Sequence, residues 1–227
     1  MSQTMSVSDA LEKRISVRAY LNKEVTQDAV RAILETAKLS PSGGNVQPWR
    51  IDVVMGAKRD GLVDEVKARI QENPFAQENE LAVYPEGLWE PFRTRRYTLG
   101  EQMYEKLGVP REDKVARLMW LQRNFEFFGA PAGLFFSLDR RFDKGQWAHL
   151  GMLMQSIALA ATERGLGTCM QEAWQTRAKT VSEFLDLPDT QQLYCGMALG
   201  HADPDAPVNT LRSERAALDE FVTFHTD

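Results

Sequence analysis

The sequence predicts a single α+β domain in which helices outnumber strands. The chain has 227 residues, of which 43% are hydrophobic, and that length and composition suit one sizeable core. Four short apolar segments, residues 51–55, 132–138, 168–171 and 193–199, have the length and composition of strands. Longer segments with helical periodicity separate them, and no internal repeat is present.

The first half of the chain alternates helices with loops and one strand. Thr26 is a suitable N-cap for a helix, and Pro41 ends that helix. Residues 42–45 contain two adjacent glycines and predict a loop before the strand at 51–55. The apolar positions that recur at helical spacing in the first helix are Val30, Ile33, Leu34 and Ala37, and those of a second helix are Leu62, Val66 and Ile70.

The second half of the chain also combines helices, strands and irregular segments. Residues 72–91 are rich in proline and predict irregular structure, and helices are expected over 92–107 and 112–127. The segment 146–164 is apolar on nearly every side, which is typical of a core or interface helix. A further helix is expected between the last two strands, and the polar tail after Gly200 has few core residues. We therefore expect the tail to lie across another surface, such as a second subunit.

Charge and composition exclude several classes of protein. The net charge of −5 gives no global attraction to nucleic acid or to an anionic membrane. No apolar run approaches the roughly 20 residues of a membrane span, and residues 1–13 do not form a secretory signal. Cys169 and Cys195 lie in apolar surroundings, which indicates buried thiols in a reducing, cytoplasmic setting.

Common catalytic motifs are missing. The segment 165–170 begins like a dinucleotide fingerprint but lacks its third glycine and follows a helix instead of a strand. The chain has no phosphate-binding Gly-Lys-Ser/Thr motif and no Gly-x-Ser-x-Gly nucleophile motif. His149, His201 and His225 stand too far apart to suggest a metal site, so none is expected.

An alternating basic segment is the first candidate binding element. Arg14, Ser16 and Arg18 point the same way if the segment is extended. Two guanidiniums and a hydroxyl on one side suit a phosphate group, because arginine binds phosphate through paired, charge-assisted hydrogen bonds. The alternative interpretation is a solvated edge in which Ile15 and Val17 face inward.

Two further features strengthen the binding interpretation. The loop at 41–49 places amide side chains and free backbone groups on a glycine-rich turn, which can approach a flat heterocycle closely. Arg212 and Arg215 in the tail form another basic cluster that can close over the same anion. The alternatives are an ordinary turn into a strand and a solvated charged face.

Together these segments resemble a known family. Residues 14–18 and 40–49 are similar to the opening signature of the FMN-binding nitroreductases. Gly165-Leu166-Gly167-Thr168 resembles that family's mid-chain motif, and residues 215–222 resemble its closing Arg-x-x-Leu-Glu-Glu-x-Val pattern. The motifs occur in the family's order over nearly the whole chain. The loop and the central insertion resemble the branch that reduces nitrobenzoates and nitroaromatic herbicides.

The resemblance implies a central mixed sheet flanked by helices, in a domain-swapped homodimer with an extended C-terminal tail and two FMN sites at the subunit interface. It also implies that a backbone N–H near Ala173 donates to flavin N5, and that an amide in the middle third, Gln122 or Asn124, contacts the cofactor. The implied FMN contacts are Arg14, Ser16, Arg18, Arg212 (or Ser213), Arg215, Gln171, Glu172 and Ala173 from one subunit, and Pro41, Ser42, Gly43 and Asn45 from the other.

The resemblance further implies an oxidoreductase that uses NADH or NADPH in ping-pong hydride transfer and reduces nitroaromatic compounds to nitroso and hydroxylamine products. The cofactor carries this chemistry, so no catalytic side chain is assigned. Residues 72–128 would form a helical substrate lid in which Trp120 and Phe125 contact the substrate, unless these aromatic residues pack the core. The alternative functions are reduction of quinones, activated alkenes or halogenated phenols, and non-catalytic flavin binding.

Overall fold

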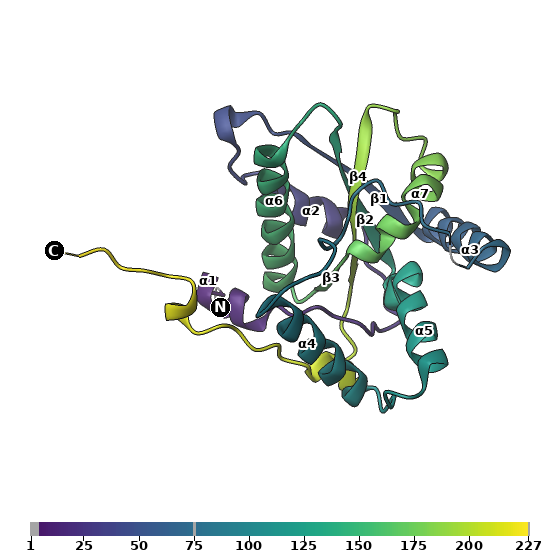
Figure 1. Ribbon diagram of the computed structural model, residues 1–227. Coiled ribbons are helices and arrows are strands. Elements are labelled where there is room, and N and C mark those ends of the chain that lie inside the picture. Colours follow the sequence, from purple (N-terminus) through teal and green to yellow (C-terminus); the bar gives the residue numbers. More distant parts are fainter. Residues whose placement is uncertain (1–4, 75, 227) are drawn as a thin grey trace.

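A four-stranded sheet forms the centre of the molecule (Figure 1), a computed structural model that describes residues 5–74 and 76–226. The strand order is β1-β2-β4-β3, and each neighbouring pair is antiparallel. The parallel contribution to the sheet is a single bridge from Ser16 to Thr168. The strands are β1 (Trp49–Met55), β2 (Ala132–Asp139), β3 (Gly167–Gln171) and β4 (Gln191–Gly200).

Helices cover both faces of the sheet. The long helix α6 packs with α2 on one face, while α3 and α7 lie on the other (Figure 1). The α-helices of the described residues are α1 (Val7–Lys13), α2 (Gln27–Ala37), α3 (Gly56–Glu72), α4 (Phe92–Lys106), α5 (Lys114–Gln122), α6 (Lys144–Glu163) and α7 (Ala178–Phe184). No helix in this part of the chain is both long and apolar enough to cross a membrane.

The two faces of the sheet have separate hydrophobic cores, and β2 contributes to both. Leu134, Phe136 and Leu138 join the core beneath α2 and α6, whereas Phe135 joins the core beneath α3 and α7. This division follows from the period of two in a strand, because successive side chains point to opposite faces. A strand buried on both faces reads as a continuous apolar run, and that run made β2 visible in the sequence.

Two elements differ from the sequence expectation. The helix expected over 112–127 ends at Gln122 and continues as a 3₁₀ segment, η2 (Arg123–Gly129), in which Phe127 and Phe128 have φ of 52° and 54°. This change of direction buries both rings in the core, which a continuous helix would not do for two adjacent side chains. Helix α1 was not expected; its N-terminus carries a reciprocal cap between Ser6 and Asp9.

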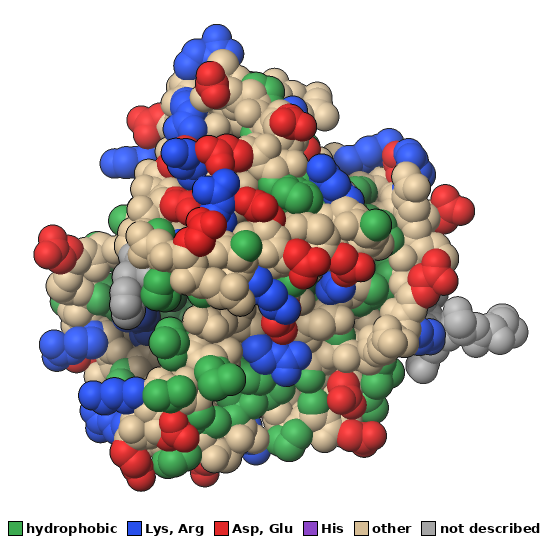
Figure 2. All heavy atoms as spheres, turned by 90° about the vertical axis from the view of Figure 1, so that its right-hand side faces the viewer, with side chains coloured by type: hydrophobic (Ala, Val, Ile, Leu, Met, Phe, Trp, Pro, Cys, Tyr) green, Lys and Arg blue, Asp and Glu red, His purple; other side chains and the backbone are tan. Residues whose placement is uncertain are grey.

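The surface formed by α3, α5 and α7 has two contrasting parts. Figure 2 shows charged side chains over its upper part and a group of hydrophobic side chains over its lower part, where α5 lies. Helix α5 exposes a set of apolar residues, namely Val115, Leu118, Met119 and Leu121. Helix α5 lies within residues 72–128. One of its sides packs against the domain, and the other exposes these apolar residues.

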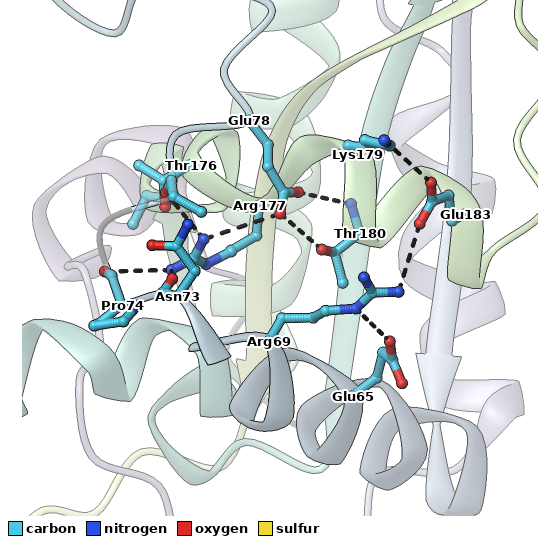
Figure 3. Close-up of polar contacts among 12 residues, drawn as sticks. Glu65, Arg69, Asn73, Pro74, Glu78, Thr176, Arg177, Lys179, Thr180 and Glu183 are labelled. Atoms are coloured by element: carbon cyan, nitrogen blue, oxygen red, sulfur yellow. Dashed lines mark hydrogen bonds and ion pairs between the residues drawn. The ribbon is translucent and has the colours of Figure 1, made fainter. Parts of the chain in front are cut away.

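A buried arginine fastens the start of that segment to the domain (Figure 3). The Arg177 guanidinium, on a side chain 4% exposed, donates to the carbonyl oxygen of Ala76 at 2.9 Å and lies 3.9 Å from Glu78. Glu78 in turn accepts from the backbone N–H and the hydroxyl of Thr180 in the first turn of α7, at 2.7 and 2.9 Å. The entry to the segment is therefore held in place by contacts about 100 residues away in sequence.

Candidate functional site

Five of the predicted ligand-binding residues converge on one pocket of ≈ 340 Å³. The pocket lies between the end of α1, helix α4 and the start of the C-terminal tail. We call it the arginine pocket. The residues that line it are Leu11, Glu12, Arg14, Ile15, Ser16, Arg18, Leu99, Leu211, Arg212, Ser213 and Arg215.

Local structure explains why the basic segment is extended beside the sheet. Helix α1 ends at Lys13, and the Val17 N–H donates to the Thr168 carbonyl oxygen at 2.9 Å. Gly167 allows this close approach, since a Cβ there would lie 2.5 Å from Val17 Cγ2. This glycine of the mid-chain motif therefore allows the segment that carries Arg14 and Arg18 to pack closely against β3.

Asn209, which the sequence analysis missed, joins the tail to this segment. Its side-chain oxygen accepts from the Arg18 backbone N–H at 2.9 Å, and its amide donates to the Ala19 and Asp203 carbonyl oxygens at 2.8 Å each. Asn209 is 7% exposed, so these bonds are shielded from water. A polar residue in a proline-containing loop gives no sequence signal for such a role, because its partners lie far away in the chain.

The arginines of the pocket have no ionic partner of their own. Among the described residues, none of Arg14, Arg18, Arg212 and Arg215 has a carboxylate oxygen within 4.0 Å. Burial lowers the pKa of Arg14, and repulsion from Arg215 lowers it further. Several unpaired guanidiniums at close range are unfavourable unless an anion lies between them, so the pocket is suited to a phosphate or a similar group.

The predicted residues at the end of β3 are one strand length from the pocket. Glu172 lies four residues beyond Thr168, which corresponds to about 13 Å along a strand. Gln171 is buried and donates to the Asn124 carbonyl oxygen at 2.8 Å, so its side chain points into the protein. Ala173 lies in the first turn of η3 (Glu172–Arg177), where backbone N–H groups lack helical partners. An elongated ligand can therefore contact both the arginine pocket and the end of β3.

Glu172 is a half-buried carboxyl at this end of the site. Burial raises the pKa of Glu172, and the hydroxyl of Tyr194, which donates to its Oε1 at 3.4 Å, opposes that shift. Burial likewise raises the pKa of Tyr194, to about 12. Both groups hold their protons more firmly than they would in water.

The glycine loop has the conformation that its sequence requires. Gly44 and Asn45 have φ of 59° and 53°, and the Ser42 hydroxyl accepts from the Gln47 N–H at 2.9 Å. The buried Ser40 bonds to Ser156 of α6 at 2.8 Å. The predicted loop residues Pro41, Ser42, Gly43 and Asn45 are therefore held in a defined, largely exposed turn.

This loop does not reach the arginine pocket within one chain. The Gly43 N–H donates to Nε2 of His149, near the start of α6, whereas Ser16 pairs with Thr168, beyond the end of α6. The part of α6 from His149 to Glu163 is about 21 Å long. Figure 1 shows the segment after α2 near the upper end of α6 and α1 near the lower end.

The two predicted substrate contacts pack against the core instead of lining the pocket. Phe125 is 9% exposed and lies edge-on to Trp174, with 5.3 Å between ring centroids. Trp120 is half-buried and packs on Phe128 at 5.7 Å. This placement agrees with the alternative that these rings pack the core, which Phe125 of η2 joins and against which Trp120 of α5 packs. Cys169 and Cys195 are free and buried, and burial raises the pKa of both thiols.

Comparison with known proteins agrees with this geometry. The nitroreductase family model matches residues 11–201. The chain is 36% identical over 218 residues to a nitrobenzene nitroreductase of Ectopseudomonas oleovorans, covering 96% of each chain. It is 35% identical over 211 residues to a 4-nitrobenzoate reductase of Pseudomonas putida, covering 93% of this chain and 92% of the relative.

A solved structure extends the similarity to three dimensions. The FMN- and NADPH-dependent nitroreductase NfnB from Sphigopyxis sp. strain HMH superposes with a TM-score of 0.95 at 41% identity, covering 98% of this chain and 100% of that one. Fold and sequence together define an oxidoreductase. The chain belongs to the nitroreductase family.

Proposed function

We propose that this protein is an FMN-dependent NAD(P)H oxidoreductase that reduces nitroaromatic compounds. The observation that carries the proposal is the arginine pocket, in which Arg14, Arg18, Arg212 and Arg215 lie together without carboxylate partners among the described residues. A flavin phosphate supplies the anion that such a pocket requires. The named relatives, which reduce nitrobenzene and 4-nitrobenzoate, support the choice of substrate class.

In this assignment the two ends of the site bind the two ends of FMN. Arg14, Arg18 and Arg215 bind the phosphate, with Ser16 and the tail residues Arg212 or Ser213 beside them. The end of β3 serves the ring, where the Ala173 N–H donates to N5. For the amide of the middle third both Gln122 and Asn124 remain candidates: the backbone carbonyl of Asn124 accepts from Gln171 at 2.8 Å at this end of β3, while the side-chain amide of Asn124 donates to the Leu121 carbonyl oxygen at 2.8 Å.

A homodimer completes the proposed site. The glycine loop lies about 21 Å along α6 from the basic segment, so the loop contacts of one flavin come from the other subunit. The C-terminal tail exposes large apolar residues that a second copy would cover, namely Leu218, Phe221 and Phe224. Strand β1 is the last strand of the sheet on its side, so a swapped tail finds an open edge there.

The chemistry divides between cofactor and protein. When bound, FMN accepts a hydride from NAD(P)H and passes two electrons to the nitro group, so that reductant and acceptor use one place in turn. The protein orients the ring by anchoring its phosphate and keeps positive charge near the site. Helix α4 and the tail bound the substrate side, and residues 72–128 form the lid in this proposal.

An absorption spectrum tests the proposal directly. The purified protein is expected to be yellow or to become yellow with FMN, and NADPH or NADH should bleach it under anaerobic conditions. Addition of 4-nitrobenzoate should restore the colour, and the hydroxylamine should appear as product. A protein that stays colourless with FMN contradicts the cofactor assignment. A flavin that bleaches but is reoxidised far faster by quinones than by nitro compounds contradicts the substrate assignment.

A further inference from the structure

A second cavity of ≈ 940 Å³ lies next to the arginine pocket. The two cavities share Arg18, Leu99, Leu211, Ser213 and Arg215, so they lie side by side. One wall of the second cavity is α4, and the other is the tail over residues 211–220. We call it the α4 groove. In the proposed function it is the space on the substrate side of the flavin.

Three arginines of α4 line this groove, and they differ in their partners. Arg93 lies 2.6 Å from Glu90, and Arg95 lies 2.7 Å from Glu220, so both charges are neutralised locally. Arg96 has no carboxylate partner among the described residues. Its guanidinium lies over the ring of Tyr84, 4.3 Å from the centroid.

The stacked geometry matters for recognition. A guanidinium that rests on an aromatic face keeps its hydrogen-bonding edge available, and the ring limits the orientations it can adopt. Such an edge matches the two oxygens of a carboxylate or a phosphate. The other carboxylates that line the groove do not compete for Arg96: Glu101 of α4 is bound by Arg117 at 2.6 Å, and Glu214 of the tail has no carboxylate oxygen within 4.0 Å of Arg96.

We propose that Arg96, held over Tyr84, binds the anionic substituent of the compound that occupies the α4 groove. Two sources supply that chemistry: the carboxylate of an aromatic acceptor and the 2′-phosphate of NADPH. This inference rests on the proposed function, because it takes the groove as the substrate side of a flavin site. It assigns to Arg96 the selection of charged over neutral substrates.

Binding to the oxidised, FMN-loaded protein tests the inference without turnover. Calorimetry compares benzoate with benzamide, and NADP⁺ with NAD⁺, for the wild type and Arg96→Gln. Loss of a charge-assisted bond predicts that benzoate or NADP⁺ binds about 10-fold more weakly, while benzamide, which lacks the carboxylate, and NAD⁺, which lacks the 2′-phosphate, are unchanged. Arg96→Lys should recover part of the preference, because it keeps the charge but not the paired hydrogen bonds.

Arg93→Gln is the matched control, since it removes the same charge from the same helix at a residue already paired with Glu90. A change in the benzoate pair assigns the site to the acceptor, and a change in the NADP⁺ pair assigns it to the reductant. If neither pair responds to Arg96→Gln more than to Arg93→Gln, the inference is overturned. The flavin spectrum separates this outcome from failure of the proposed function, because it reports FMN binding independently.

Discussion

The arginine pocket and the glycine loop are both predicted parts of one binding site, yet the chain treats them differently. The pocket is complete within one chain: Asn209 ties the tail to the segment at 14–18 across about 190 residues. The loop is anchored separately, through the bond from Gly43 to His149 near the start of α6 and the bond from Ser40 to Ser156 in the second half of that helix. In the proposed function, one copy supplies the anion-binding end and the loop serves a second copy.

Helix α6 is the reason for this separation. It is buried along much of its length, with Leu150, Ile157 and Ala161 fully buried, so it cannot bend to bring the two parts together. A rigid helix of this kind fixes the distance between the loop and the arginine pocket of one chain, and therefore where the loop of a partner chain would have to lie. This separation is the geometric reason for which we propose a site shared between two chains.

The largest expected effect comes from removing the charges of the pocket. Arg14→Ala or Arg18→Ala should weaken FMN binding about 10- to 100-fold, since each bond to a charged phosphate contributes about 1.5–3 kcal/mol. Riboflavin, which lacks the phosphate, should bind the variants as it binds the wild type. Fluorescence titration of both flavins measures this difference.

The exposed Arg31 of α2 provides the control for a simple loss of charge. Arg31→Ala should leave both affinities unchanged. The variants of Arg14 and Arg18 should remain folded dimers, because neither guanidinium has a carboxylate partner among the described residues. Full retention of FMN in both pocket variants would refute the role of the segment.

The close contact between Gly167 and Val17 gives a second way to disturb the arginine pocket. In Gly167→Ala the added methyl group would meet Val17 Cγ2 at 2.5 Å, and such overpacking costs about 1–3 kcal/mol. We expect a lower melting temperature together with lower FMN content. Gly151→Ala, in α6, meets nothing within 4 Å and should lower neither. Equal behaviour of the two variants would show that Gly167 does not position the segment.

The loop is expected to respond differently from the pocket. Asn45→Val places a β-branched residue at φ 53°, which costs roughly 1–2 kcal/mol and should displace the loop. Because the proposed role of the loop is contact with the flat ring and not with the phosphate, FMN and riboflavin should weaken by a similar factor, about 5- to 30-fold. The neighbouring Val46→Ala, at φ −67°, is the control. A loss confined to FMN would place the loop at the phosphate instead.

The smallest effect concerns Glu172, between the two regions. Burial raises the pKa of its carboxyl in the folded protein, so the folded state holds this proton more tightly than the unfolded chain does. Stability therefore falls as the pH rises from about 4.3 through the raised value. Glu172→Gln should abolish this part of the pH dependence. Urea titrations across that range measure it, and parallel curves for both proteins would contradict the account.

The sequence predicts the local elements well and the long-range ones poorly. Apolar composition and periodicity located α6 and the four strands within about two residues, which is the usual uncertainty of element ends. Thr26 was correctly predicted as the N-cap of α2, but that helix ends at Ala37, before Pro41. The conversion of α5 into η2 was missed, because the burial of Phe127 and Phe128 overrides helical propensity there.

In the candidate site, too, local features were predicted from the sequence and long-range contacts were not. Spacing suggested that Arg14, Ser16 and Arg18 act together, and the clustering of Arg212 and Arg215 suggested that the tail closes over the same anion. All five residues line one pocket. Asn209, the stacked Arg96 and the buried positions of Trp120 and Phe125 depend on contacts between distant segments, for which a single sequence carries no signal.

Mixing two defective variants tests the shared site most directly. One chain carries Arg14→Ala with Arg18→Ala, and the other carries Asn45→Val; the heterodimer is purified with two different tags. If the loop serves the partner's pocket, one of the two sites has both parts intact, so flavin content should recover to about half that of the wild type. If each chain uses its own loop, both sites remain defective, and the absence of recovery would contradict the account.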